Sequence, residues 1–393
     1  MYKKHYSSIW ILSLSLIATH VHTFAWQQHY SKLELEHIPA KQYLVIHPYS
    51  ETILAAKDIH TQQDPASLTK LMSLLIALEQ IQAGNIHTDD LVHVSHKAWK
   101  APGSRMFLNI NSKVKLSKIL EGITVASGND ATIALAEHIA GNEATFVEMM
   151  NNKAKELKMH ETQFKNSSGL PEKGHVSSAH DLALLSSHFI KNHAYYLPKM
   201  QKKWIQYNNI KQNNRNRLLW HDPSITGMKT GHTNSAGYCL VASVKRNQQP
   251  LIAITLGSMN EQTRDQSAST LLNHASGHYI HSSIHSDPEL GQSILWYGKQ
   301  KQVQPQLAKP IHLSLPKINS SYQKKVELQR DLFAPIQAGQ VIGSYKIIHN
   351  NKIIGQTELI SRKAIATSGW WQQLLDWISY KSICILRTIK YYV

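Results

Sequence analysis

The hydrophobic periodicity of this chain changes near residue 278, and that change restricts the folds it can adopt. Before it, segments with helical spacing alternate with segments in which apolar and polar residues alternate as in strands. The helix-like segments are residues 68–81, 131–139 and 146–157, with a closing helix around Leu271 and Leu272. The strand-like segments are residues 41–47, 52–56, 238–243 and 251–256. The mixture predicts an α+β domain over residues 30–277.

Beyond residue 286 the helical spacing disappears. Residues 303–315, 340–348 and 352–360 alternate like strands, and Asn350-Asn351 suits a tight hairpin turn. This stretch predicts a small all-β domain over residues 286–362.

The N-terminus has the pattern of a secretory signal peptide. Lys3 and Lys4 precede the apolar residues 9–18, and Thr23 and Ala25 supply small residues at positions −3 and −1 of a cleavage site. The alternative is a short membrane anchor, although the apolar stretch is short for spanning a bilayer. We therefore expect residues 1–25 to be removed on export.

Residues 368–393 predict an amphipathic helix. Its tryptophans and aliphatic residues share about half of the helix circumference, and most of its polar residues lie opposite. The charges of this stretch argue against a spanning helix, whereas tryptophan together with basic residues suits the membrane interface. The alternative is a helix that packs on its own protein. The interpretation we favour is peripheral attachment to the periplasmic face of the cytoplasmic (inner) membrane.

The net charge indicates an anionic partner. Lysine and arginine number 42 against 26 aspartate and glutamate residues, a formal charge of +16. Nucleic acid, a membrane surface or an acidic polymer could each balance it, and export argues against nucleic acid. The two cysteines, Cys239 and Cys384, are too few for a disulfide scaffold or a cysteine-based zinc module, and we expect no bond between them.

A first candidate motif is Ser67-Leu68-Thr69-Lys70, at the start of a helical segment. Residues three apart share a helix face, so Ser67 and Lys70 can interact. Serine needs a base to become a nucleophile, and lysine can be that base if burial lowers its pKa. The same spacing occurs elsewhere in the chain, and Ser67 alone could simply cap a helix.

A second candidate motif is Ser127-Gly128-Asn129, just before another helical segment. Its hydroxyl could relay a proton, and its amide could bind a substrate peptide group. Taken alone, it also fits a helix cap.

A third candidate motif is Lys229-Thr230-Gly231, followed by His232 and leading towards a strand. A cation, a hydroxyl and an unhindered glycine on a strand edge suit an extended peptide that ends in a carboxylate.

Together the three motifs resemble those of penicillin-binding proteins and class A β-lactamases, in the same order. Over residues 35–370 the chain most resembles the low-molecular-mass penicillin-binding proteins that are D-alanyl-D-alanine carboxypeptidases. The resemblance implies a serine β-lactamase/DD-peptidase fold, in which helices flank an antiparallel sheet. It also implies peptidoglycan stem peptides as substrate, β-lactams as covalent inhibitors and no cofactor or metal.

The resemblance implies three catalytic residues. Ser67 would attack the carbonyl between two terminal D-alanines, Lys70 would accept its proton, and Ser127 would pass a proton to the leaving amine. The implied substrate-binding residues are Asn129, Lys229, Thr230, Gly231, His232 and Arg264. Arg264 would bind the carboxylate, or else be an ordinary helix-surface arginine. The backbone N–H groups of Ser67 and His232 would form the oxyanion hole.

Three other functions remain open from the sequence. A class A-like β-lactamase needs a glutamate base between the second and third motifs, and no convincing Glu-x-x-Leu-Asn occurs there. A DD-endopeptidase would cut crosslinks, but such relatives usually lack the β-domain. A non-catalytic β-lactam sensor or wall-binding protein would keep the motifs without turnover.

Histidine is abundant, with 24 residues. Four of them lie near the domain junction, namely His274, His278, His281 and His285. No carboxylate accompanies them as in His-Glu-x-x-His, so we expect a polar linker there and no metal. Two acidic residues, Glu172 and Asp181, could belong to the rim of the site, or Asp181 could cap a helix.

Overall fold

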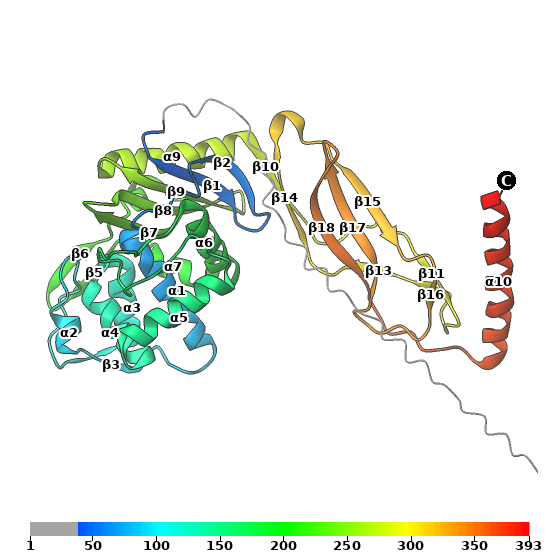
Figure 1. Ribbon diagram of the computed structural model, residues 1–393, viewed down its shortest axis with the longest axis horizontal. Helices are drawn as coiled ribbons and strands as arrows, with labels where there is room; N and C mark the ends of the chain where they lie inside the picture. Colours follow the sequence, from blue (N-terminus) through cyan, green and yellow to red (C-terminus); the bar gives the residue numbers. More distant parts are fainter. Residues whose placement is uncertain (1–37, 393) are drawn as a thin grey trace, which may run out of the picture.

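The structure is a computed structural model that describes residues 38–392. It consists of a larger domain of helices and strands, a narrower domain of strands, and the C-terminal helix α10 (Trp370–Tyr392) (Figure 1). This arrangement confirms the expected α+β domain followed by an all-β domain and a terminal helix. The predicted signal peptide, residues 1–25, lies outside the described residues.

An antiparallel sheet of five strands forms the centre of the larger domain. Its order is β2-β1-β9-β8-β7. The strands are β1 (Gln42–His47), β2 (Thr52–Lys57), β7 (Ile225–Thr233), β8 (Gly237–Arg246) and β9 (Gln249–Ser258). Strand β7 ends the sheet, so one of its backbone edges has no partner among the described strands.

Helices cover both faces of this sheet. Helices α8 (Leu218–His221) and α9 (Glu261–His278) pack on one face, and a larger helical layer covers the other (Figure 1). That layer comprises α1 (Lys70–Gln82), α2 (His96–Trp99), α3 (Leu116–Glu121), α4 (Asn129–Ala140), α5 (Glu143–Glu156), α6 (Ala179–His193) and α7 (Leu197–Met200). Two small two-stranded sheets complete the domain, β3 (Leu91–His93) with β4 (Lys113–Lys115) and β5 (Trp204–Tyr207) with β6 (Ile210–Asn213).

The side chains of the sheet divide between two cores. On β9, Leu251 and Ala253 join the core beneath α9, whereas Ile252 and Ile254 join the core beneath the larger helical layer. A strand buried on both faces needs apolar residues at successive positions. This explains the continuous apolar runs of β8 and β9 in the sequence.

The second domain has a four-stranded sheet in the order β13-β18-β17-β15. The strands of the whole domain are β10 (Tyr279–Ile284), β11 (Ser293–Trp296), β12 (Gln302–Val303), β13 (Pro305–Leu307), β14 (Ile311–Pro316), β15 (Gln323–Leu328), β16 (Leu332–Phe333), β17 (Val341–His349) and β18 (Lys352–Ser361). The expected hairpin turn at Asn350-Asn351 is confirmed, and both residues have left-handed φ angles of 48° and 60°. The single strand expected over 303–315 is interrupted before Pro310, which has no N–H to donate.

The polar linker expected at the junction is wrong, because that segment is strand β10, paired antiparallel with β14. Its polar side chains find partners across the pair: His281 Nδ1 lies 2.9 Å from Ser314 Oγ, and Ser283 Oγ lies 2.8 Å from His312 Nδ1. The ring of His281 also stacks on that of His47 of the larger domain, with centroids 4.9 Å apart. These cross-strand hydrogen bonds help a polar segment to form a strand at the domain junction.

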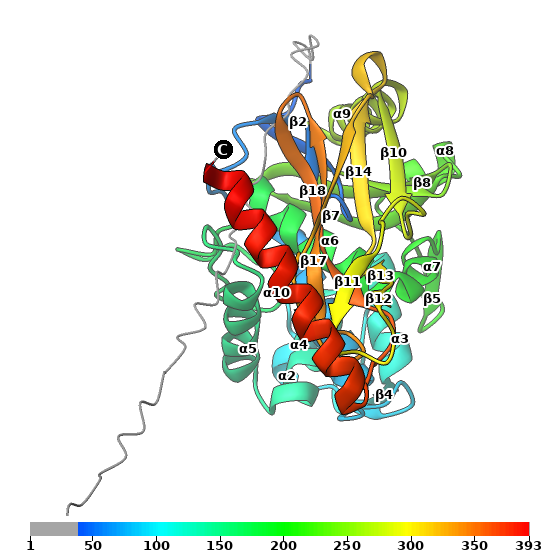
Figure 2. The ribbon, with the colours of Figure 1, turned by 90° about the vertical axis from the view of Figure 1, so that its right-hand side faces the viewer.

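Helix α10 lies on the side of the second domain that faces away from the larger domain (Figures 1 and 2). It docks through its polar face. Asp376 accepts hydrogen bonds from Tyr297 N and Lys301 Nζ, and Arg387 pairs with Asp331. Its large apolar side chains point to solvent, and Trp370, Trp371 and Ile385 are 60–66% exposed. Among the described helices there is none with the length and apolarity to cross a membrane.

Candidate active site

Ser67 lies on a 3₁₀ turn, Ala66–Thr69, directly before α1. Asp64 holds the start of this turn by accepting a hydrogen bond from Ala66 N at 2.8 Å. Strand β7 packs tightly against it: a Cβ on Gly231 would lie 3.1 Å from Pro65 O and 3.2 Å from Ser67 N. Glycine at position 231 therefore brings the open edge of β7 within reach of Ser67.

Lys70 is fully buried in the first turn of α1 and reaches Ser67. Its Nζ lies 2.9 Å from Ser67 Oγ, 2.7 Å from Asn129 Oδ1 and 2.5 Å from the carbonyl oxygen of Ser168. An ammonium can donate to all three acceptors. After losing a proton, the amine keeps two donors for Asn129 and Ser168, and its lone pair can accept the proton of the Ser67 hydroxyl.

Burial lowers the pKa of Lys70 to about 7, and the positive charge of Arg215 adds to this effect. Asp130 partly opposes the shift by stabilising the ammonium form. A lysine with an ordinary pKa would be almost entirely protonated at neutral pH. The environment of Lys70 instead keeps a large fraction of the amine unprotonated, as a general base requires.

Ser127 and Asn129 reach the site from the junction between a π-helical turn, Gly122–Ala126, and α4. Ser127 has a left-handed φ of 57° and is 2% exposed. Asn129 begins α4, and its Nδ2 donates to Pro102 O at 2.7 Å while its Oδ1 accepts from Lys70. The amide is thus held between one wall of the cleft and the buried lysine.

Asp130, next to Asn129, holds the neighbouring segment between α2 and β4 in place. Its two carboxylate oxygens accept hydrogen bonds from Met106 N at 2.8 Å and Leu108 N at 3.1 Å, which orders the segment between α2 and β4. Sequence analysis did not single out this residue. Its position next to Asn129 in the second motif was the available signal.

The segment between α5 and α6 forms the wall of the cleft opposite Asn129. It contacts the turn that carries Ser67 at Gly169, next to Ser168, whose carbonyl oxygen contacts Lys70. Gly169 has a left-handed φ of 81°, and a Cβ there would lie 1.8 Å from Ala66 O. His175 of the same segment lies 2.8 Å from Thr69 Oγ1 through its Nε2. The tight approach at Gly169 positions the carbonyl that contacts Lys70.

We expect Gly169→Ala to lower the free energy of unfolding by about 2–3 kcal/mol and to slow acylation of Ser67. The added methyl would combine left-handed strain with a clash against the backbone of Ala66. Gly174→Ala is the matched control, because Gly174 has a similar φ of 82° but only the flexible Lys165 side chain near its Cβ position. Urea unfolding measures the change in stability, and the rate at which a β-lactam acylates Ser67 measures the second effect. Equal losses in the two variants would contradict this account.

A cleft of about 400 Å³ joins these elements. Seven of the predicted site residues line it, namely Ser67, Ser127, Asn129, Thr230, Gly231, His232 and Arg264. The other two, Lys70 and Lys229, are buried beside it. The structure therefore brings all nine together, although they span residues 67–264 of the chain.

Four basic side chains, those of Lys70, Arg215, Lys229 and Arg264, lie in or beside the cleft. Burial lowers the pKa of Lys229 well below its usual value, and the nearby charges of Lys70, Arg215 and Arg264 add to this effect. Arg264 is 2% exposed in the first turn of α9 and donates to Asp265 Oδ1 at 2.8 Å, so the interpretation as a surface arginine is wrong. The positive charges of Arg215 and Arg264 in the cleft suit an anionic ligand.

Arg215 is a site residue that sequence analysis missed. It lines the cleft on the segment between β6 and α8, and its Coulombic effect reaches both buried lysines. It belongs to none of the three motifs, so the sequence offered no signal beyond its charge.

The described lining of the cleft contains few acidic residues. Among its described lining residues, Glu261 on α9 is the one carboxylate, and it lies 3.7 Å from Arg217. Asp181 lies at the start of α6, where it accepts hydrogen bonds from Glu161 N and Thr162 Oγ1. Glu172 accepts a hydrogen bond from Asn166 Nδ2 at 3.1 Å. Neither Asp181 nor Glu172 is among the residues that line the cleft.

Comparison with known proteins gives consistent matches for both domains. Residues 27–260 match the S11 peptidase family described as D-alanyl-D-alanine carboxypeptidase, and residues 282–367 match the C-terminal domain of penicillin-binding protein 5. The D-alanyl-D-alanine carboxypeptidase DacD of Salmonella typhimurium is 35% identical over 340 residues, covering 84% of this chain and 87% of the relative.

Solved structures agree with these matches. Penicillin-binding protein 5 from Haemophilus influenzae has a TM-score of 0.78 and 33% identity, covering 84% of this chain and 98% of that chain. Penicillin-binding protein D2 from Listeria monocytogenes, solved in a cefotaxime-bound form, has a TM-score of 0.56 and 27% identity, covering 61% of this chain and 97% of that chain.

Proposed function

Because this chain belongs to the D-alanyl-D-alanine carboxypeptidase family of serine peptidases, we propose that it removes the terminal D-alanine of peptidoglycan stem peptides with Ser67 as nucleophile. Its activity class is that of its family, a serine-type D-Ala-D-Ala carboxypeptidase. The roles of nucleophile and base are assigned from one contact: Lys70 Nζ lies 2.9 Å from Ser67 Oγ. The pKa of that lysine is lowered to about 7, so its amine can accept the proton of Ser67.

Acylation follows from this contact. As Ser67 Oγ attacks the carbonyl carbon between the two D-alanines, its proton passes to Lys70 Nζ. The backbone N–H groups of Ser67 and His232 bind the oxyanion of the tetrahedral intermediate. Ser127 relays the proton to the nitrogen of the departing D-alanine, the C–N bond breaks, and an ester to Ser67 remains. Water then hydrolyses this ester and restores the Ser67 hydroxyl.

Substrate recognition rests on the charge of the cleft and on the free edge of β7. An extended peptide can lie along this edge and hydrogen-bond to its backbone, while Gly231 lets the edge approach the turn that carries Ser67. The terminal carboxylate is bound by Thr230 and Arg264, with the charge of Arg215 beside them. This accounts for specificity toward a free C-terminus.

β-Lactams are proposed to acylate the same serine, as covalent inhibitors. The Listeria monocytogenes protein solved with cefotaxime shares the fold of the larger domain. The described cleft has no carboxylate beside Lys70 on the wall formed by Ser168 and Gly169, where a deacylating glutamate would be needed in a class A β-lactamase. We therefore favour slow release of the β-lactam over rapid turnover.

The test of this function is release of D-alanine from diacetyl-L-Lys-D-Ala-D-Ala by the purified protein. The same peptide with a C-terminal amide is the matched control, because it lacks the carboxylate that the cationic cleft should bind. Release from the acid and little from the amide is the expected result. β-Lactam labelling without release would favour a sensor, rapid β-lactam hydrolysis would favour a β-lactamase, and cleavage of crosslinked peptides alone would favour an endopeptidase.

The location is also a proposal: export through residues 1–25, and peripheral attachment of α10 to the outer face of the cytoplasmic membrane. Two observations support it. The polar face of α10 docks on the second domain through Asp376 and Arg387, and the apolar face is left exposed. An exposed apolar helix face rich in tryptophan has the chemistry of an interfacial anchor.

Truncation after Ser368 is expected to release the protein from membranes. A full-length variant separates anchoring from folding: Leu375→Gln, Ile378→Gln and Ile385→Gln together change exposed positions of the apolar face. We expect membrane affinity to fall by about 100-fold or more in this variant, and Ser379→Ala with Ser382→Ala on the same helix to leave it unchanged. Vesicle co-sedimentation measures the affinity, and binding that survives truncation would contradict the proposal.

A further inference from the structure

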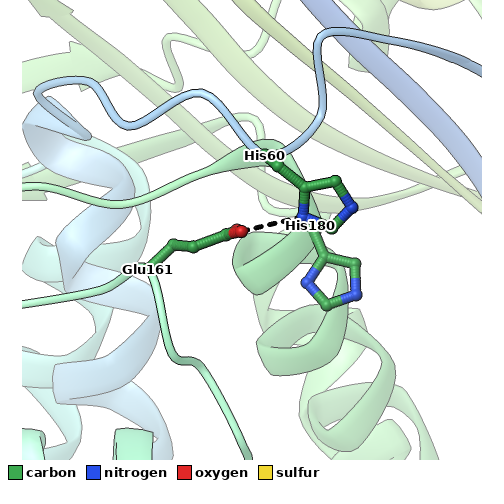
Figure 3. A group of neighbouring side chains, drawn as sticks. All are labelled: His60, Glu161 and His180. Atoms are coloured by element: carbon green, nitrogen blue, oxygen red, sulfur yellow. Dashed lines mark hydrogen bonds and ion pairs between the residues drawn. The ribbon is translucent and has the colours of Figure 1, made fainter.

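Charged and aromatic side chains gather at two places outside the catalytic cleft. At the first, Ser178 Oγ donates to Glu161 Oε2 at 2.6 Å, and Glu161 Oε1 lies 2.8 Å from His60 Nδ1, with His180 close by (Figure 3). The Glu161 carboxylate is therefore used within the protein, where it ties the segment after β2 to the segment after α5. The second place is a pocket in the helical layer of the larger domain, and its groups are open to a ligand.

This pocket has a volume of about 450 Å³ and lies between α1, α3 and α7. None of its described lining residues also lines the catalytic cleft. Its floor is apolar: the side chains of Leu78, Leu120 and Tyr196 are buried there, and Ile81 adds a partly buried one. Sites for small organic molecules typically have volumes of about 300–1,000 Å³ and an apolar lining of this kind.

Hydrogen bonds hold the aromatic part of the floor in place. Thr124 Oγ1 donates to Leu120 O at 2.7 Å, so the Tyr196 hydroxyl, 3.2 Å from Thr124 Oγ1, is the donor in that contact. Burial raises the pKa of Tyr196 to about 12, so the hydroxyl keeps its proton at neutral pH. The ring therefore presents an uncharged, apolar body to the pocket. Tyr195, which is 61% exposed, extends the aromatic lining towards solvent.

The rim of the pocket carries an excess of positive charge. Lys118, Lys199 and Lys202 line it together with one carboxylate, that of Glu121. Lys118 Nζ lies 2.8 Å from Glu121 Oε2, and Lys202 pairs with Oε1 of the same carboxylate. One carboxylate thus serves two lysines, and within the described part of the chain Lys199 forms no ion pair. An anion is the group that would balance this charge.

We propose that this pocket binds a small amphiphilic anion, a molecule with one carboxylate at the end of a single apolar chain. The chain lies on Leu78, Ile81 and Tyr196, and the carboxylate lies between the ammonium groups of Lys199 and Lys202. The lysine stems add apolar surface beside the chain while their charged ends stay in water. A volume of about 450 Å³ suits one chain of medium length, so a free monoacyl anion fits better than a lipid held in a bilayer.

The experiment is calorimetric titration of decanoate, below its micellar concentration, into the full mature protein. Titration of 1-decanol, which has the same chain without the charge, tests the role of the lysines, and octanoate tests the role of the chain. Lys199→Gln and Tyr195→Ala change exposed side chains that line the pocket, so both variants should fold. Lys203→Gln is the matched control, because Lys203 is an exposed lysine of the same segment that does not line the pocket.

The expected result is one decanoate per chain, with octanoate binding about tenfold more weakly because it buries two fewer CH₂ groups. Lys199→Gln should weaken decanoate binding about fivefold and leave decanol binding unchanged. Tyr195→Ala should weaken the binding of both ligands about tenfold, because both lose the same aromatic contact. Lys203→Gln should bind decanoate as the unaltered protein does.

Absence of saturable binding, decanol binding as tight as decanoate binding, or unchanged affinity in Lys199→Gln and Tyr195→Ala would each overturn the proposal. Loss of binding in Arg215→Gln instead would place the anion in the catalytic cleft, and loss in the triple α10 variant instead would place it on the exposed helix face. Both results would also overturn it. Circular dichroism of each variant verifies that a lost site is not a lost fold.

Discussion

Ser67→Ala is expected to lower the rate of D-alanine release by about 10⁴- to 10⁶-fold, as loss of the nucleophile does in serine hydrolases. The substitution removes the oxygen that lies 2.9 Å from Lys70 Nζ and leaves the base without a proton to accept. Folding should be preserved, because alanine is smaller than serine and the 3₁₀ turn is held by Asp64 through Ala66 N. Substrate can still bind, so the loss should appear in kcat.

Ser112→Ala is the matched control for this prediction. Ser112 and Lys115 repeat the Ser-x-x-Lys spacing, but Ser112 Oγ donates to Asn109 O and Lys115 pairs with Asp89 at the surface. Release of D-alanine by this variant should equal that of the unaltered protein. Substantial turnover by Ser67→Ala, with no loss of β-lactam labelling, would exclude Ser67 as the nucleophile.

Lys70→Met is expected to slow acylation by about 10²- to 10⁴-fold, the usual contribution of a general base. Methionine keeps much of the buried stem but has no group to accept the proton of Ser67. Lys115→Met, at the surface, is the control. The second-order rate of labelling by a fluorescent β-lactam isolates acylation from later steps.

The pH dependence of acylation gives this prediction its sharpest form. With the pKa of Lys70 at about 7, the amine is the active, unprotonated form above that pH and the inactive ammonium below it. The acylation rate should therefore rise about tenfold per pH unit below 7 and level off above 7. Lys70→Met should lose this rising limb. A limb that persists unchanged in Lys70→Met would assign it to another group, such as Lys229, whose pKa burial also lowers.

Local patterning predicted the main elements correctly because each depends on neighbouring residues. The helical spacing over 68–81 became α1, and the strand-like segments 41–47 and 52–56 became the paired strands β1 and β2. Asn350-Asn351 became the left-handed turn between β17 and β18. Hydrophobic spacing and turn chemistry act over a few residues, so the sequence displays them directly.

Pairing between distant segments was less visible. Strand β10 was expected as a linker because its histidines and serines look polar in isolation, whereas in the fold His281 and Ser283 hydrogen-bond to Ser314 and His312 of β14. The sequence also did not show which face of α10 packs on the second domain. Amphipathicity marked two faces, and the contacts of Asp376 and Arg387 in the fold show which one docks.

The sequence by itself determined the order of the elements and the three motifs that hold the chemically competent side chains, because both are written in short-range patterns. The tertiary structure alone decided how those side chains act. It buried Lys70, set Ser168 O against it, and added Arg215 from outside every motif. Burial and approach between residues far apart in the chain depend on packing of the whole domain, and packing is what lowers a lysine pKa and assembles a site.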